Sequence, residues 1–168
     1  MDGRNRDDKA TRWLHGRNLQ CMRNHAGLSQ SQLAERIGWT IANISNLETG
    51  IRDAAAIRVE TAEQVAAALG IDIDEYARRI IDTSSCTSPW PTIPTVDGTS
   101  LTARRKELGL TRKQAAELSG IGVNTLYQWE HGIVDVRTVE LRRIIALART
   151  LRLTLPDLLR AARPEHEK

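Results

Sequence analysis

The sequence repeats itself once, and this repeat constrains the fold more than any other feature. When the chain is shifted by 82 residues, residues 19–51 align with residues 101–133 without a gap, and eleven of the 33 aligned positions are identical. The identical pairs are Leu19/Leu101, Arg23/Arg105, Gly27/Gly109, Leu28/Leu110, Gln32/Gln114, Ala34/Ala116, Glu35/Glu117, Gly38/Gly120, Glu48/Glu130, Gly50/Gly132 and Ile51/Ile133. Because self-similarity at a fixed offset indicates duplicated structural units, we expect two copies of one small domain.

A Ser/Thr/Pro-rich stretch separates the two copies. Residues 83–98 read TSSCTSPWPTIPTVDG, and their three prolines cannot continue a helix. In an extended form this stretch would reach about 50 Å, at about 3.1 Å per residue. The expected organisation is therefore an N-terminal domain at 1–82, a linker at 83–98 and a C-terminal domain at 99–168.

Composition favours helices as the building elements. Hydrophobic residues make up 40% of the chain, but aromatic residues only 4%, and Phe is absent. The core must therefore be built from Leu, Ile, Val and Ala, which pack well between helices. Amphipathic patterns ended by glycines predict five helices in each copy. They are expected at about 8–26, 29–38, 41–49, 57–69 and 73–81, and at about 100–108, 111–120, 123–131, 137–151 and 155–162.

The second helix of each copy begins with the same local device. Ser29 precedes Gln32 by three residues, and Thr111 precedes Gln114 by three, which is the spacing of a capping box. A short turn containing glycine then leads to a third helix. Two short helices joined by such a turn form a helix-turn-helix arrangement.

The segments LSQSQLAERIGWTIANISNLETG and LTRKQAAELSGIGVNTLYQWEHG resemble the core of the Cro and phage-repressor family, often called Xre type. The resemblance implies an all-α fold of two tandem five-helix, lambda-repressor-like domains joined by a Pro-containing linker. The second copy departs from the pattern at two positions, because Gly122 replaces the Thr40 cap and Ser119 replaces the core residue Ile37. These departures bear on the rigidity of its third helix.

The resemblance places base-reading side chains at the exposed start of each third helix. The expected readers are Ile41, Ala42, Asn43 and Asn46 in the first copy, flanked by Thr40, and Val123, Asn124, Thr125 and Gln128 in the second, with Tyr127 beside them. Asn and Gln can pair with adenine through two hydrogen bonds, and Ile, Ala, Val and Thr can cover a thymine methyl group. The alternative is that these residues merely form a solvated helix face.

The resemblance also separates phosphate contacts from structural charges. Gln30 and Arg112 occupy the first turn of the second helix, which the family directs at a phosphate. Further candidates, for which an ordinary solvated charge is the alternative, are Arg17, Arg104, Lys106 and Lys113. The pairs Arg23/Glu48 and Arg105/Glu130 recur at the repeat offset, and in the family these positions form a partly buried ion pair.

Catalysis and cofactor binding are not expected. The chain has no glycine-rich phosphate loop and no nucleophile motif. Cys21 and His25 could share one helix face, but two ligands do not make a zinc site. Two cysteines are also too few to suggest a disulfide framework, and they fit a reducing cytoplasm. The N-terminal residues are charged, without the apolar stretch of a signal peptide or membrane anchor.

The predicted function is transcriptional repression through sequence-specific binding of double-stranded DNA. The C-terminal part is the more basic, since residues 83–168 hold 13 Lys/Arg against 9 Asp/Glu, whereas residues 1–82 hold 11 against 12. The protein is expected in the cytoplasm at the nucleoid, as a monomer or weak homodimer that affects RNA polymerase only indirectly. Because the third helices differ, an asymmetric site is expected.

Two alternatives remain at this point. One copy could serve as a protein-interaction or dimerisation module, as in antitoxins built on the same motif. The arrangement is also similar to an immunity repressor of an actinobacterial phage, with a host regulator of the same family as the other possible origin.

Overall fold

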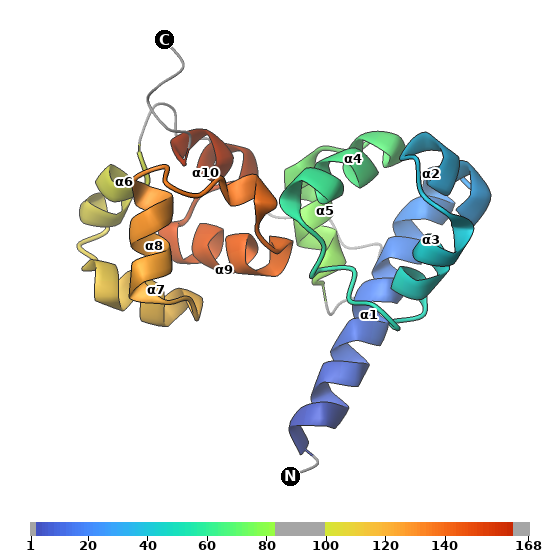
Figure 1. The fold of residues 1–168 in the computed structure, drawn as a ribbon, viewed down its shortest axis with the longest axis horizontal. Coiled ribbons are helices and arrows are strands. Elements are labelled where there is room, and N and C mark those ends of the chain that lie inside the picture. Colours follow the sequence, from blue (N-terminus) through green and yellow to red (C-terminus); the bar gives the residue numbers. More distant parts are fainter. Residues whose placement is uncertain (1–2, 83–99, 163–168) are drawn as a thin grey trace. The chain divides into compact units, whose positions relative to one another are not determined.

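The computed structural model describes residues 3–82 and 100–162, and the α-helices in these ranges are labelled α1 to α10 in Figure 1. The chain divides into two compact units, Met1–Trp90 and Pro91–Lys168. Within the described ranges the regular elements are helices, which confirms the all-α class. The expected linker at 83–98 lies outside the described residues, so the domain boundaries at 82 and 99 stay predictions.

The first unit contains five helices. They are α1 (Gly3–His25), α2 (Gln30–Arg36), α3 (Ile41–Glu48), α4 (Val59–Leu69) and α5 (Ile73–Ile80). Helix α1 packs against α3 and α5, and α2 packs against α3 and α4. The core between them is formed by fully buried aliphatic side chains, including Leu19, Leu33, Ile44, Leu47 and Ile80. Helix α1 begins at Gly3, five residues before the predicted start, and extends past the rest of the unit (Figure 1).

Two glycines set the close approach of α1 to the end of α3. A Cβ atom at Gly16 would lie 2.5 Å from the carbonyl oxygens of both Leu47 and Glu48. A Cβ atom at Gly50, whose φ is 74°, would lie 2.9 Å from the Cα of Trp13. Only glycine fits at such backbone contacts, so α1 fixes the position of the C-terminal end of α3.

The second unit repeats this plan with one addition. Its elements are α6 (Leu101–Glu107), α7 (Arg112–Ser119), α8 (Val123–Glu130), the 3-10 turn η1 (Val136–Thr138), α9 (Leu141–Leu151) and α10 (Leu155–Ala161). The single helix predicted at 137–151 is therefore wrong in its first turn. Asp135 accepts a hydrogen bond from the backbone N–H of Arg137 at 2.9 Å, which favours a separate turn before α9.

The predicted caps are present at the helix starts. The Ser29 hydroxyl accepts from Gln32 N at 3.1 Å while Ser29 N donates to Gln32 Oε1 at 2.8 Å. The Thr111 box repeats both bonds, at 3.2 and 2.9 Å. Asp72 and Thr154 cap α5 and α10 with a single bond to the backbone, because their side chains accept from Glu75 N and Asp157 N. Capping satisfies backbone N–H groups that the helix itself cannot, so these side chains define where each helix begins.

Cysteine usage differs from the expectation. Cys21 lies half-buried on α1 and is disulfide-bonded, whereas the sequence suggested that the cysteines stay reduced. The other cysteine of the chain, Cys86, lies outside the described residues. The His25 ring, considered above with Cys21 as a possible pair of metal ligands, instead donates to the backbone carbonyl of Cys21 at 3.0 Å.

Candidate nucleic-acid interface

The turn between α2 and α3 is held rigidly on its inner side. Ile44 and Leu47 of α3 are fully buried beside Leu33 of α2. Gly38 adopts a φ of 68°, which lets the chain reverse direction. Thr40 then caps α3, because its hydroxyl accepts from Asn43 N at 3.3 Å. Packing on one face and a cap at the start leave the opposite face of α3 as a fixed outer surface.

The predicted readers of the first copy lie on this outer surface. The Ile41 side chain is 53% exposed, Ala42 and Thr40 are exposed, and Asn43 and Asn46 are half-buried. Ile41 therefore places an apolar side chain on the outer surface at the start of α3, where an external partner could reach it.

The second copy presents the corresponding residues with the same pattern. Val123 is 44% exposed, Asn124 is exposed, and Thr125 and Gln128 are half-buried. Leu126 and Trp129 point into the core. Gly122 provides no side-chain cap for α8, as the sequence indicated, yet the helix still begins at the position equivalent to the start of α3.

The side-chain amides of the readers are free of internal bonds. Among the described residues, no hydrogen bond is made by the side chains of Asn43, Asn46, Asn124 and Gln128. Each amide combines one acceptor oxygen with two donor hydrogens. The outer surfaces of α3 and α8 thus offer paired donors and acceptors to an external partner.

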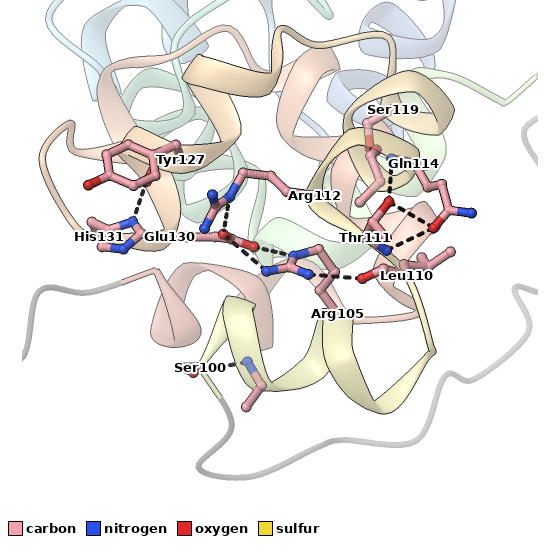
Figure 2. Close-up of polar contacts among 12 residues, drawn as sticks. Ser100, Arg105, Leu110, Thr111, Arg112, Gln114, Ser119, Tyr127, Glu130 and His131 are labelled. Carbon is pink, nitrogen blue, oxygen red and sulfur yellow. Dashed lines mark hydrogen bonds and ion pairs between the residues drawn. The ribbon is translucent and has the colours of Figure 1, made fainter.

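A buried ion pair joins the first helix of each copy to the third. Arg23 Nε lies 2.6 Å from Glu48 Oε1, and Arg23 Nη1 donates to the Leu28 carbonyl at 2.6 Å. In the second copy Arg105 Nε lies 2.5 Å from Glu130 Oε1 and Nη1 donates to the Leu110 carbonyl at 2.9 Å (Figure 2). In each copy one guanidinium therefore fixes both the end of the third helix and the turn before the second helix. The predicted structural role of these pairs is confirmed.

Gln30 and Arg112 extend the ion pairs rather than pointing away from the protein. Gln30 Nε2 donates to Glu48 Oε2 at 2.7 Å, and Arg112 Nε donates to Glu130 Oε2 at 2.8 Å (Figure 2). Each glutamate is thus held from two sides. The substitution of Gln by Arg gives the second copy one extra positive charge at this position, and the Arg112 side chain is 33% exposed. The phosphate contact expected of both residues stays a prediction.

The two arginines control the ionisation of Glu130. Burial alone would raise the pKa of this carboxyl group, but hydrogen bonds from Arg105 and Arg112, helped by their charges, lower the pKa below its ordinary value. Glu130 therefore remains a carboxylate at neutral pH and keeps Arg112 in place beside α8.

The sequence did not predict that Arg112, Tyr127 and His131 stack beside α8. The Arg112 guanidinium lies 5.0 Å from the centre of the Tyr127 ring, and the Tyr127 and His131 ring centres are 4.0 Å apart (Figure 2). The His131 ring also donates to the Tyr127 carbonyl at 2.7 Å. The spacing of four residues between Tyr127 and His131 is the signal that could have predicted this contact.

The remaining predicted phosphate contacts divide into two kinds. Lys106 and Lys113 are exposed, and Arg17 is exposed with hydrogen bonding only to Gln20, at 2.7 Å, and a contact with the Trp13 ring. Arg104 instead donates to the Leu151 carbonyl at 3.0 Å and so ties α6 to the end of α9. Arg104 has a structural role, while the others remain on the surface.

In the described part of the chain, no group of three or more His, Cys, Asp or Glu side chains could hold a metal ion. None of the described helices combines the length and the apolar character needed to cross a membrane.

Comparison with known families agrees with the geometry of the two units. The family described as helix-turn-helix matches the chain twice, over residues 22–76 and 101–158, which together make up more than half of its 168 residues. Both matches contain the second and third helices and the turn between them. A comparison with curated proteins found no match.

Proposed function

Because the chain belongs to the helix-turn-helix family of DNA-binding transcriptional regulators, we propose that it is a repressor that reads an asymmetric duplex site with α3 and α8. The observation that carries this proposal is the exposure of the first turn of both helices. Ile41 and Val123 project outward while Ile44 and Leu126, one turn later, are buried. Such a helix can enter a major groove with its leading side chains at the base edges.

The difference between the two reading surfaces supports an asymmetric site. Ala42 corresponds to Asn124, Asn43 to Thr125, and Asn46 to Gln128 at the repeat offset. Two different sets of side chains select two different half-sites. Half-sites are commonly about 34 Å apart, and one chain would occupy both if the segment between its two copies spans that distance. Once the first domain has bound, the second binds intramolecularly at a high effective concentration.

Phosphate contacts would hold each helix in its groove. The proposed anchors are Gln30 and Thr40 in the first copy and Arg112 and Lys113 in the second. Arg112 uses Nε for Glu130, so its two terminal nitrogens can donate to a phosphate without breaking the ion pair. The stronger anchor therefore belongs to the second copy.

Repression would follow from occupation of the DNA. We infer that the protein acts at the nucleoid in the cytoplasm, as a monomer or weak homodimer, and affects RNA polymerase only by blocking its path. Arginine accounts for 20 of the 24 basic residues. This bias suits a GC-rich genome such as that of an actinobacterial phage, in which the protein would act as an immunity repressor.

The proposal is tested by selecting bound duplexes from a randomised pool with the full-length chain at physiological salt. The enriched site should be asymmetric, and native mass spectrometry should find one chain on each duplex. Asn46→Ala should relax selection in one half of the site and Gln128→Ala in the other. Two chains on a minimal symmetric site would refute the asymmetric reading, and absence of any enrichment would refute DNA recognition itself.

One side chain favours a second candidate function, in which the second copy binds protein. Leu118 on α7 is 67% exposed, whereas its counterpart Arg36 donates to the Ala68 carbonyl at 2.8 Å. An exposed Leu in place of a bonded Arg would give the second copy an apolar contact point for dimerisation or for an antitoxin-like partner. Sedimentation of the full chain tests this: Leu118→Arg should abolish any self-association, and a wild type that is monomeric at all concentrations would exclude this form of contact.

A further inference from the structure

We propose that both recognition helices select A·T base pairs, reading the thymine methyl group with Ile41 and Val123 and adenine with the neighbouring amides. This inference rests on the proposed function, since it names the bases that the same surface recognises. It also makes a chemical claim that DNA binding alone does not require.

The first argument is the absence of charge on the reading surfaces. Glu48 is the only charged residue of α3, Glu130 is the only charged residue of α8, and each is held in its internal ion pair. Guanine is most often read by Arg or Lys, and cytosine by the carboxylates of Asp or Glu. Neither helix can supply such a group to a G·C pair.

The side chains that bond the two buried glutamates do not supply a guanine-reading cation either. In the first copy the position beside Glu48 holds the neutral Gln30. In the second, Arg112 donates Nε to Glu130 at the C-terminal end of α8 and stacks on Tyr127, rather than lying beside the leading residues. Its place suits a phosphate at the groove edge better than a guanine on the groove floor.

The second argument is the apolar residue that leads each helix. Ile41 and Val123 are the first residues of α3 and α8, and both remain exposed although each helix has a well-filled core side. The thymine methyl is the one apolar group that standard bases present in the major groove. Contact with a branched aliphatic side chain at the leading position would remove both the thymine methyl group and that side chain from water.

The third argument is the set of free amides behind these residues. Asn43 and Asn46 follow Ile41 in α3, and Asn124 and Gln128 follow Val123 in α8. Adenine presents an acceptor at N7 beside a donor at N6, which matches the donor and acceptor of one amide. The apolar and amide groups on each helix therefore complement the two bases of the same pair.

The experiment begins with the duplex selected from the randomised pool by the full-length chain. Each thymine is replaced singly by deoxyuridine, which removes only the methyl group, and each adenine by 7-deazaadenine, which removes the N7 acceptor. Loss of one covered methyl should weaken binding about fourfold, equivalent to about 0.8 kcal/mol. Loss of one adenine acceptor should weaken it about tenfold, within the usual range for a two-bond contact.

Matched variants assign the effect to a side chain. Ile41→Ala should abolish the deoxyuridine effect at one position of the first half-site, and Val123→Ala should do so in the second. Ile51→Ala is the control, because Ile51 is also an exposed Ile, at 67%, but follows α3 instead of leading it. It should leave every deoxyuridine effect unchanged.

The outcomes separate this inference from the proposed function. A site enriched in A·T pairs, with losses on deoxyuridine that vanish in Ile41→Ala or Val123→Ala, supports it. A selected site whose essential pairs are G·C overturns it and leaves selective DNA binding intact. An A·T-rich site that is insensitive to deoxyuridine also overturns it, since recognition would then depend on duplex shape. Absence of any selected site overturns both proposals.

Discussion

Replacement of the buried arginine by Met should affect the two domains unequally. Arg23→Met leaves the Glu48 carboxylate with only the neutral amide of Gln30 at 2.7 Å. Arg105→Met leaves Glu130 with a second guanidinium, because Arg112 Nε remains 2.8 Å away. The substitutions are chemically identical, occupy equivalent positions, and each removes one hydrogen bond to a backbone carbonyl. Their difference therefore measures what the second arginine contributes.

The magnitudes follow from the burial of the two carboxylates. Loss of one partner from a buried ion pair commonly costs about 3–5 kcal/mol, because the other charge stays buried and uncompensated. We expect Arg23→Met to fall in that range, since the Glu48 side chain is 2% exposed. Arg105→Met should cost only about 1–3 kcal/mol, the usual cost of losing a hydrogen bond to a charged group. Arg112 is one-third exposed, so screening makes its compensation partial.

Hydrogen exchange read by mass spectrometry in urea can measure both effects in the full-length chain, because peptides from α3 and α8 report their own domains. In thermal unfolding of a domain of this size, each kcal/mol lowers Tm by roughly 4–8 °C. Arg23→Met should therefore lower the Tm of the first domain by roughly 12 °C or more. The double variant Arg23→Met/Glu48→Leu should recover much of the loss. An Arg105→Met variant as unstable as Arg23→Met would refute the reasoning.

Three further predictions concern charge and packing. The pKa of Glu130 is lowered below its ordinary value of 4.5 in the folded protein. Its contribution to stability is therefore present at neutral pH and is lost as the pH falls from about 4.5 through the folded pKa. Urea titrations of the second domain at decreasing pH should show this loss in the wild type but not in Glu130→Gln. Gly16→Ala should destabilise the first domain by at least about 1–3 kcal/mol in thermal unfolding, because the new methyl group meets two carbonyl oxygens at 2.5 Å, and an unchanged Tm would contradict the close approach. Arg112→Gln should reduce the slope of log K against log salt by about one, whereas Gln30→Arg should increase it by about one; equal slopes in wild type and variants would exclude phosphate contacts here.

Local signals in the sequence predicted much of the fold. The Ser29 and Thr111 boxes, the Asp72 and Thr154 caps and the closing glycines depend on residues within one turn of each other, and the structure contains them as expected. The start of α1 was missed because the charged residues before position 8 show no apolar periodicity that would extend the helix toward the N-terminus. The turn η1 was missed because Asp135 competes locally with helix formation, a signal that was present but not used.

The orientation of Arg112 could not be predicted from local sequence. Its position in the first turn of α7 suits either a phosphate or a nearby carboxylate, and the choice depends on a glutamate 18 residues further along the chain. Only tertiary packing brings that glutamate within reach. The stack on Tyr127 depends on the same packing. Sequence patterns therefore predict least well the orientation of side chains such as Arg112, which bond a buried residue and are also partly exposed.

The pattern of change between the two copies is itself evidence about function. The positions that hold the framework together are identical, as in the pairs Arg23/Arg105 and Glu48/Glu130, and both copies place them at closely similar distances. None of the four positions predicted to read bases is identical between the copies. Folding alone explains why the ion pair is retained, because loss of one partner leaves a buried charge uncompensated. Divergence at the predicted reading positions is a separate observation, and it is what recognition of two different half-sites would require.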